Sequence, residues 1–433
     1  MSTFSPALRL ASGACLLAAL APLSALASGL ILYEIGTDNT GLANAGAAAR
    51  AQGPSTLASN IAGMSYLDGT QITAGAQLIT GQVNFDTDSS NNLSGGGGHN
   101  AMPLSPGASL FITHALNEQW HVGFANYGDF GLGIDYSDDW AGRYYLQNGT
   151  LLGLTLMPSL SFKANEQWSF GLGLRALYGL SESELALDNN PLGIGTHPDG
   201  SLEYKADDWG FGVNLGVLYQ ATPATRVGLA YTSAIDLSFS DKLDPKGLSA
   251  VEQNLWNAGG LTNAKTTLDM QVPQTLTVSL FHQLDSAWAL LASANWQDWS
   301  RFGEIGLDLD ARNPTSTTLD ANYRDSWHVS LGTQYQHSQK LRWNLGAAYD
   351  SSPVGDQYRT VTNPMGEAWR LGTGIDYALE QDLSLNLSYE FIWMGDMAVQ
   401  QSKALPISDP KQVSGSYENA WMQAISSSLT WRY

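Results

Sequence analysis

Hydrophobic and polar residues alternate one by one along most of the chain after residue 69, and this period of two predicts β-strands. Between Trp168 and Tyr178 the even positions are apolar, and small or polar residues fill most of the odd ones. The same alternation recurs at 211–219 and 383–394. Strands of this kind suit a membrane barrel, where apolar side chains face lipid and the others face the lumen.

The alternating runs number about fourteen. They cover 69–85, 104–115, 119–130, 149–163, 167–187, 202–220, 225–240, 265–283, 287–310, 322–337, 340–352, 366–378, 382–397 and 418–433. Short turns, such as 116–118, alternate with long loops, such as 241–264. We therefore predict an all-β fold: a transmembrane antiparallel β-barrel over residues 69–433, with both termini in the periplasm.

The last strand ends as strands of outer-membrane barrels do. Leu429, Trp431 and Tyr433 share one parity, so the strand has an apolar outer face and an aromatic final residue. We expect the barrel-assembly machinery of the outer membrane to bind the protein through this strand.

Composition agrees with a barrel and argues against other classes. Only 14% of the residues are charged, while glycine (45) and tryptophan (14) are abundant. After the N-terminal segment no run of about 18 apolar residues occurs, which excludes transmembrane helices. The net charge of −20 argues against nucleic acid as a partner.

The first 27 residues have the pattern of a signal peptide. Arg9 precedes an apolar stretch, and Ala25-Leu26-Ala27 has the small-x-small form of a cleavage site. A retained transmembrane helix is the alternative, but the apolar stretch is short for one. Cys15 is the only cysteine and lies in this segment, so we expect the mature protein to contain neither thiol nor disulfide.

Three tryptophans occupy the same position in the predicted barrel. Trp120, Trp168 and Trp288 each follow a short turn directly. This placement is typical of the aromatic girdle at a membrane interface. A carbohydrate-binding platform is the alternative, which the repeated position disfavours.

Residues 28–68 do not have the pattern of a strand. They are rich in small residues, as in the stretch from Gly41 to Arg50. A barrel of fourteen strands is wide enough to enclose a channel. We therefore predict that this segment forms an N-terminal hatch inside the lumen; a disordered periplasmic leader is the alternative.

The segment Asn60-Ile61-Ala62-Gly63 resembles the Asn-Pro-Ala-Gly stretch that closes the hatch of the FadL family of outer-membrane transporters. Here Ile61 stands where the family has proline, and isoleucine neither restricts φ nor removes a backbone donor. The segments 272–284 and 296–302 are similar to the family's eighth and ninth strands. The resemblance covers most of residues 29–433, and the family has fourteen strands and a hatch.

A further match is Asn126-Tyr127-Gly128, near the end of the third predicted strand. The resemblance implies a kink here that opens a lateral gap in the barrel wall. The residues agree in part, because Gly123, Gly128 and other glycines are dense in this strand, and strand glycines mark bends and bulges. The alternative is that glycine is common in all these strands.

The resemblance implies a transporter of long-chain fatty acids or related hydrophobic molecules in the cell outer membrane. Its substrates are captured at apolar outer loops and leave sideways into lipid through the third strand. The alternatives are an aromatic hydrocarbon channel of the same architecture, a general porin, and an adhesin. Outer-membrane lipid and lipopolysaccharide are expected partners, and acidic loops suit divalent cations that bridge lipopolysaccharide.

Two sets of residues are candidates for ligand binding. The first is apolar and has helical spacing in an outer loop: Leu248, Val251, Leu255 and Trp256. These side chains either receive the ligand or pack the loop onto itself. The second is basic, because a carboxylate headgroup needs a cation. Arg175 and Arg301 are the candidates, although lumen arginines such as Arg342 and Arg370 often pair with carboxylates such as Asp376 and Glu390 instead.

No catalytic pattern stands out. The seven histidines have no metal-ligand spacing, and no Gly-x-Ser-x-Gly is present. We predict no enzymatic activity, no cofactor and no metal.

Overall fold

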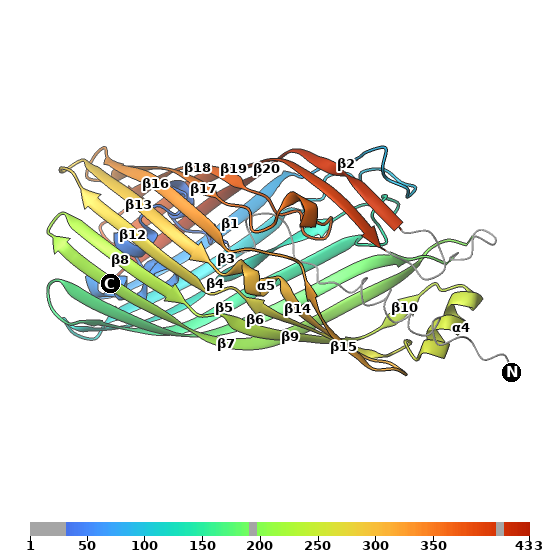
Figure 1. Cartoon of the computed structure of the whole chain (residues 1–433). Coiled ribbons are helices and arrows are strands. Elements are labelled where there is room, and N and C mark those ends of the chain that lie inside the picture. The colour runs from blue at the N-terminus through green and yellow to red at the C-terminus, as the bar shows by residue number, and fades with distance from the viewer. Residues whose placement is uncertain (1–31, 190–196, 404–410) are drawn as a thin grey trace.

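Fourteen antiparallel strands close into a barrel, which confirms the predicted fold class (Figure 1). The structure, a computed structural model, describes residues 32–189, 197–403 and 411–433, so the predicted signal peptide lies outside the described residues. The wall strands are β1 (Thr70–Gln82), β3 (Ser105–Ala115), β4 (Trp120–Asp135), β5 (Asn148–Lys163), β6 (Trp168–Leu187), β7 (Gly200–Thr222), β8 (Thr225–Thr232), β12 (Thr275–Gln283), β13 (Trp288–Gln297), β16 (Ser326–Gln336), β17 (Leu341–Asp350), β18 (Ala368–Ala378), β19 (Leu383–Lys403) and β20 (Lys411–Arg432). Among the described residues, no helix is both long and apolar enough to cross a membrane.

The last strand closes the barrel by pairing with the first. β20 runs antiparallel to β1 from Trp421 opposite Gln82 to Arg432 opposite Gln71. Thr70 and Tyr433 exchange backbone hydrogen bonds of 3.1 and 2.8 Å. The short turns and the C-terminus share one end of the barrel, the turn end; the long loops form the other, the loop end (Figure 1).

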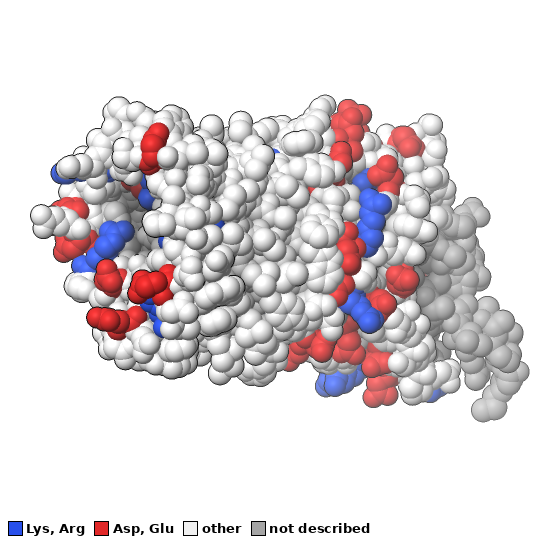
Figure 2. Space-filling view, turned by 60° about the vertical axis from the view of Figure 1, so that its left-hand side comes forward, with Lys and Arg blue, Asp and Glu red and all other residues white. Residues whose placement is uncertain are grey.

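The three tryptophans that follow short turns have the same local structure. The Asn117 side chain accepts hydrogen bonds from the backbone N–H of Gln119 and Trp120, each at 2.9 Å. Asn165 and Asp285 make the same bonds before Trp168 and Trp288. Each indole contacts an aromatic ring of the neighbouring strand: Phe162, Tyr219 and Tyr335, respectively. In Figure 2 the middle of the visible wall is almost free of charged side chains, which gather toward the two ends.

Four shorter strands form a second sheet, the inner sheet. They are β9 (Ile235–Lys242), β11 (Lys265–Val272), β14 (Glu304–Asp310) and β15 (Thr315–Asp320), in the order β15-β14-β11-β9. They continue β8, β12, β13 and β16 toward the loop end, after a break in each strand. The predicted strands 225–240, 265–283 and 287–310 were therefore wrong in being continuous.

The breaks explain why alternation was misleading here. Pro273 has no N–H for a ladder bond, and α5 (Trp299–Phe302) interrupts the third of these strands. The apolar side chains of the inner sheet face protein instead of lipid, for example Leu237 and Phe239, each 1% exposed. A period of two shows that one face of a strand is buried, but not what buries it.

Small elements complete the loop end: β2 (Phe85–Thr87), β10 (Asp244–Lys246), α4 (Ala250–Gly259) and η3 (Asp356–Tyr358). β2 pairs with β20 and β10 with β7.

Residues 32–66, called the hatch below, lie inside the barrel near its turn end (Figure 1). They form η1 (Thr40–Leu42), α2 (Ala47–Arg50), α3 (Thr56–Ser59) and η2 (Ile61–Tyr66). These short helices contact wall strands on opposite sides of the barrel, including β5 to β8 and β16 to β20. The boundaries 28–68 for a hatch and 69–433 for a barrel stay a prediction, although the first wall strand begins at Thr70.

Candidate functional site

The pairing between β3 and β4 stops halfway along the wall. It runs from Ala115 opposite His121 to Ser109 opposite Tyr127. Beyond this point β4 pairs only with β5 until Asp135, whose N–H donates to the carbonyl of Ala101 at 3.0 Å, and the first residues of β3 pair only with β1. We call this unpaired stretch the open seam.

A β-bulge causes the separation. Gly128 pairs with Leu154 and Phe130 with Gly153, so Asp129 is an extra residue in β4. A bulge bends its strand away from its neighbour. Gly131 follows with φ of +120°, a conformation open to glycine, and Pro106 on the β3 side has no N–H to pair with.

The residues predicted to form a lateral opening divide into two groups. Tyr127 and Gly128 lie at the bulge; Tyr127 is buried and stacks on Phe111. Asn126 donates a weak hydrogen bond of 3.4 Å to the carbonyl of Thr155 across the β4–β5 ladder. Gly123 lies nearer the turn end, where an added Cβ would meet Met64 Sδ of the hatch at 2.6 Å.

Asp129 joins the seam to Arg175 of β6. Its carboxylate pairs with the Arg175 guanidinium, whose side chain is 2% exposed. The guanidinium also lies 3.4 Å from Thr155 Oγ1 and 3.5 Å from the carbonyl of Ser233. The backbone N–H of Leu32 donates to the carbonyl of Asp129 at 3.2 Å. A buried cation and the start of the described hatch therefore meet at the seam.

A cavity of about 100 Å³ lies beside these residues. Its lining includes Tyr127, Asp129 and Arg175 from the wall, Tyr33 from the hatch, and Pro273 from the break between β11 and β12. Ligand pockets usually have about 300–1,000 Å³. A long hydrophobic ligand would fit here only after the hatch or its neighbours move.

The hatch crosses the lumen from the seam to a buried charge cluster on the opposite side. Two residues after Leu32, Glu34 pairs with Arg370 of β18. Arg370 also binds Asp350 at 2.5 Å and lies 3.7 Å from Glu390, and His328 contacts Asp350 at 2.6 Å. All of these side chains are at most 6% exposed. One guanidinium thus ties this part of the hatch to three strands.

Asn60 anchors the middle of the hatch. Its side-chain amide donates to the carbonyls of Ala48 at 2.7 Å and Val217 at 3.0 Å, and its oxygen accepts from the N–H of Ala62 at 3.1 Å. Ile61 is the first residue of η2, a position where a backbone N–H has no helical partner and proline is tolerated. Isoleucine in place of the family's proline is thus compatible with this turn.

Wall glycines allow the hatch backbone to approach the wall closely. An added Cβ would lie 2.4 Å from Ala62 N at Gly171, 1.8 Å from Ala48 O at Gly228 and 1.9 Å from Leu42 O at Gly346. These glycines come from different sides of the barrel. At these three positions, which we call the glycine seat, the hatch backbone lies against wall residues that have no side chain.

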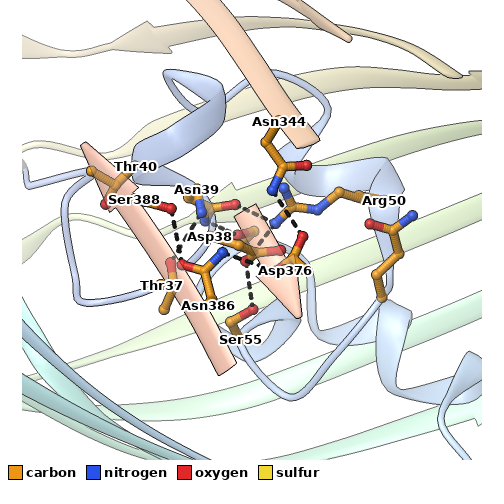
Figure 3. Close-up of polar contacts among 12 residues, drawn as sticks. Thr37, Asp38, Asn39, Thr40, Arg50, Ser55, Asn344, Asp376, Asn386 and Ser388 are labelled. Carbon is orange, nitrogen blue, oxygen red and sulfur yellow. Dashed lines mark hydrogen bonds and ion pairs between the residues drawn. The ribbon is translucent and has the colours of Figure 1, made fainter. Parts of the chain in front are cut away.

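Polar contacts line another side of the hatch (Figure 3). Asp38 binds Arg50 at 2.9 Å and Ser55 at 3.4 Å. On the wall, Asp376 accepts from Asn344 at 2.8 Å and pairs with Arg342 at 2.9 Å. A polar cavity of about 270 Å³ lies between the two groups. The predicted pairing of lumen arginines with carboxylates is confirmed for Arg342, and the 3.7 Å contact of Arg370 with Glu390 agrees with it.

The structure does not bring the remaining candidates to the cavity. In α4, Trp256 is buried in a cluster of apolar side chains, and Leu248, just before the helix, packs against that cluster. Leu255 is half-buried and Val251 is 53% exposed. Burial raises the pKa of the Glu252 carboxyl on this helix, and Asp188 adds to the effect. Arg301 is 61% exposed and pairs with Glu304. Of the two basic candidates, only Arg175 lines the cavity.

Comparisons with known proteins agree with this architecture. A family model described as outer membrane protein transport protein (OMPP1/FadL/TodX) matches residues 18–431. A long-chain fatty acid transport protein of Escherichia coli O6:H1 is 28% identical over 406 residues, which cover 86% of this chain and 89% of that protein.

Solved structures share the fold. A FadL homologue of Pseudomonas aeruginosa has a TM-score of 0.83 at 20% identity, covering 93% of this chain and 99% of the other. The toluene transporter TodX of Pseudomonas putida has a TM-score of 0.67 at 18% identity, covering 94% and 98%.

Proposed function

The chain belongs to the OMPP1/FadL/TodX family of outer-membrane transport proteins, and from that premise we propose that it takes up long-chain fatty acids or related hydrophobic molecules. The substrate leaves the lumen sideways into the membrane, through the open seam between β3 and β4. The observation that carries this proposal is the end of β3–β4 pairing at Tyr127, directly beside a lumenal cavity that Arg175 lines.

Sideways exit follows from the cost of exposing an acyl chain to water. Each buried CH₂ contributes about 0.8 kcal/mol, so release of a long chain into the periplasm costs on the order of ten kcal/mol. Exit through the seam places the chain directly in lipid. The hatch, seated on glycines and held by Asn60, blocks the straight route through the barrel.

Arg175 is the proposed headgroup ligand. A charge-assisted pair between guanidinium and carboxylate is strong and directional, and a fatty acid carboxylate competes with Asp129 for the same guanidinium. Displacing Asp129 loosens the bulge residue that also binds Leu32. Substrate binding is thereby coupled to the edge of the seam.

The proposed orientation places the turn end, with both Thr70 and Tyr433, in the periplasm. The long loops then face the outside, where lipopolysaccharide is the neighbouring lipid. The C-terminal strand, which ends on Tyr433, is the proposed contact with the barrel-assembly machinery.

Uptake by transporter-deficient cells tests the substrate class. Cells that express this protein are given a labelled long-chain fatty acid or labelled toluene, and cells that carry an empty vector provide the background. We expect uptake of the fatty acid, which agrees with the 28% identity to a protein named for that transport. Uptake of toluene alone would assign the protein to aromatic hydrocarbons. Uptake of neither, with the barrel folded in the outer membrane, would contradict the proposal and favour a porin or an adhesin.

A further inference from the structure

The inner sheet packs on the inside of the wall through an apolar interface. The side chains of Ile235, Leu237 and Phe239 on β9 are each 1% exposed. They point at the inner faces of β6 and β7, where Gly179, Gly210 and Gly212 face them. An added Cβ would lie 2.1 Å from an Ile235 γ-carbon at Gly210 and 2.8 Å from a Leu237 δ-carbon at Gly179.

These glycines leave three wall positions beneath β9 without side chains, and the partners of two of them in the β6–β7 ladder, Leu177 and Asp208, stand beside them. The β9 side chains fill the space over the glycines in this conformation. If the inner sheet moved away from the wall, a narrow groove would remain, with the glycines and the buried Leu177 in its floor. An acyl chain has the shape and polarity to take the place of the β9 side chains.

The apolar interface connects the outer loops with the seam. One continuous cluster of buried side chains includes Trp256 of α4, Leu185 of β6, the three β9 residues and Phe130 beside the bulge. Val272, at the end of β11, belongs to this cluster and also lines the cavity beside Arg175. A chain that follows this cluster inward therefore arrives at the proposed headgroup site.

The edge of the inner sheet is attached to the wall by only a few hydrogen bonds. Among the described residues, β9 pairs with β11 and with no wall strand. Its other edge is satisfied by separate contacts from β7: Asp208 accepts from Ser238 N–H at 2.7 Å, and the Tyr204 hydroxyl donates to the carbonyl of Phe239 at 2.8 Å. The backbone attachments of this edge are short: Ser233 N–H donates to the carbonyl of Val213 at 2.9 Å, and β10 pairs with β7 over three residues.

The breaks that separate the four strands of the inner sheet from the wall strands lie at the same height along the barrel. The pair Thr232–Thr275 ends the wall ladder and the pair Ile235–Val272 begins the inner one. The wall strands β13 and β16 are separated from β14 and β15 at the same end. These breaks form a hinge line, and Arg175 reaches it through the carbonyl of Ser233.

We propose that the interface between β9 and the β6–β7 wall is the binding slot for the hydrophobic chain, and that it opens when the inner sheet swings about the hinge line. The inference rests on the proposed function. The slot takes an unbranched acyl chain along its length, with the carboxylate directed toward Arg175.

A reversible disulfide tests the slot. In the variant Gly210→Cys/Ile235→Cys, the new Cβ at 210 lies within disulfide reach of residue 235, so the bond fastens the inner sheet to the wall. Cys15, the only native cysteine, lies in the expected signal peptide. Labelled fatty acid uptake is measured with the disulfide oxidised and then reduced.

The matched control is Ser240→Cys/Thr267→Cys, whose hydroxyls lie 2.7 Å apart on the exposed face of the inner sheet. That disulfide joins β9 to β11 and leaves the sheet free to swing. We expect oxidised Gly210→Cys/Ile235→Cys to fall to background uptake and to recover on reduction, while the control variant transports in both states. Unchanged uptake by the oxidised test variant would overturn the slot. No uptake by the unmodified protein would instead contradict the proposed function, and the slot with it.

Discussion

Arg175 and Asp129 carry the chemistry of the site at the scale of single residues. Strand parity placed Arg175 in the lumen, because Phe170, Leu172 and Leu174 mark the lipid face of β6. Nothing in the sequence indicated Asp129. The even positions Phe124 and Phe130 are both apolar, yet the bulge turns Phe130 inward to 1% exposure while Phe124 stays exposed. The alternation of apolar and polar residues does not reveal a bulge of this kind. Only the local density of glycine indicated the bulge.

Replacing Arg175 tests the headgroup assignment. The variant Arg175→Gln/Asp129→Asn keeps polar groups at both positions and leaves no carboxylate without a cation. We expect fatty acid affinity to fall about ten- to a hundredfold, because hydrogen bonds to charged groups contribute about 1.5–3 kcal/mol. Binding of a fluorescent fatty acid to the purified protein measures this. Arg301→Gln is the control, since Arg301 is exposed and is not among the residues that line the cavity; an equal loss in that variant would contradict the assignment.

The buried charge cluster predicts unequal effects on stability. Arg370→Met leaves Glu34, Asp350 and Glu390 buried without a guanidinium, and breaking a buried ion pair from one side costs about 3–5 kcal/mol. Glu34→Gln keeps an acceptor for Arg370 and removes one of three neighbouring carboxyls, so we expect a much smaller loss. Thermal unfolding of the two variants in detergent compares them. Equal midpoints would show that Arg370 does not hold this cluster together.

At the scale of elements, the sequence predicted wall strands better than it predicted what they face. The short turns and the tryptophans after them were recognisable because each turn depends on a few local residues. The inner sheet was not recognisable in the sequence, because a strand face buried by protein and one buried by lipid give the same alternation. The hatch helices are three to six residues long, which is too short for a helical period to appear in the sequence.

The glycine seat makes a prediction about the hatch as an element. Gly228→Ala places a Cβ 1.8 Å from the carbonyl of Ala48, and Gly346→Ala places one 1.9 Å from that of Leu42. Overpacking of this kind costs about 1–3 kcal/mol, and here moving the hatch relieves it. We expect both variants to raise ion conductance in planar bilayers. The control is Gly53→Ala, where no atom lies within 4 Å of the new Cβ. Conductance equal to the control would mean that the hatch is not seated on these glycines.

At the scale of the whole molecule, the number of strands and the closure of the barrel followed from alternation and turn spacing. The contacts of the hatch could not be predicted from the sequence, because they join residues such as Asn60 and Val217 that lie far apart in the chain. Long-range contacts of this kind leave no periodic signal. The segment from Asn60 to Gly63 resembles a hatch segment of the family and so indicated a hatch. Only the structure shows which wall residues the hatch contacts.

The central claim is that the substrate leaves through the open seam, and deletion of Asp129 tests it most directly. Removing the one extra residue of β4 restores a regular register with β5 and lets β4 pair with β3 beyond Tyr127. Asp129→Ala is the control, because it removes the same carboxylate but keeps the bulge. We predict that fatty acid uptake falls to background in the deletion and persists in Asp129→Ala, with both barrels folded. Uptake by the deletion variant at the level of the unmodified protein would contradict lateral exit.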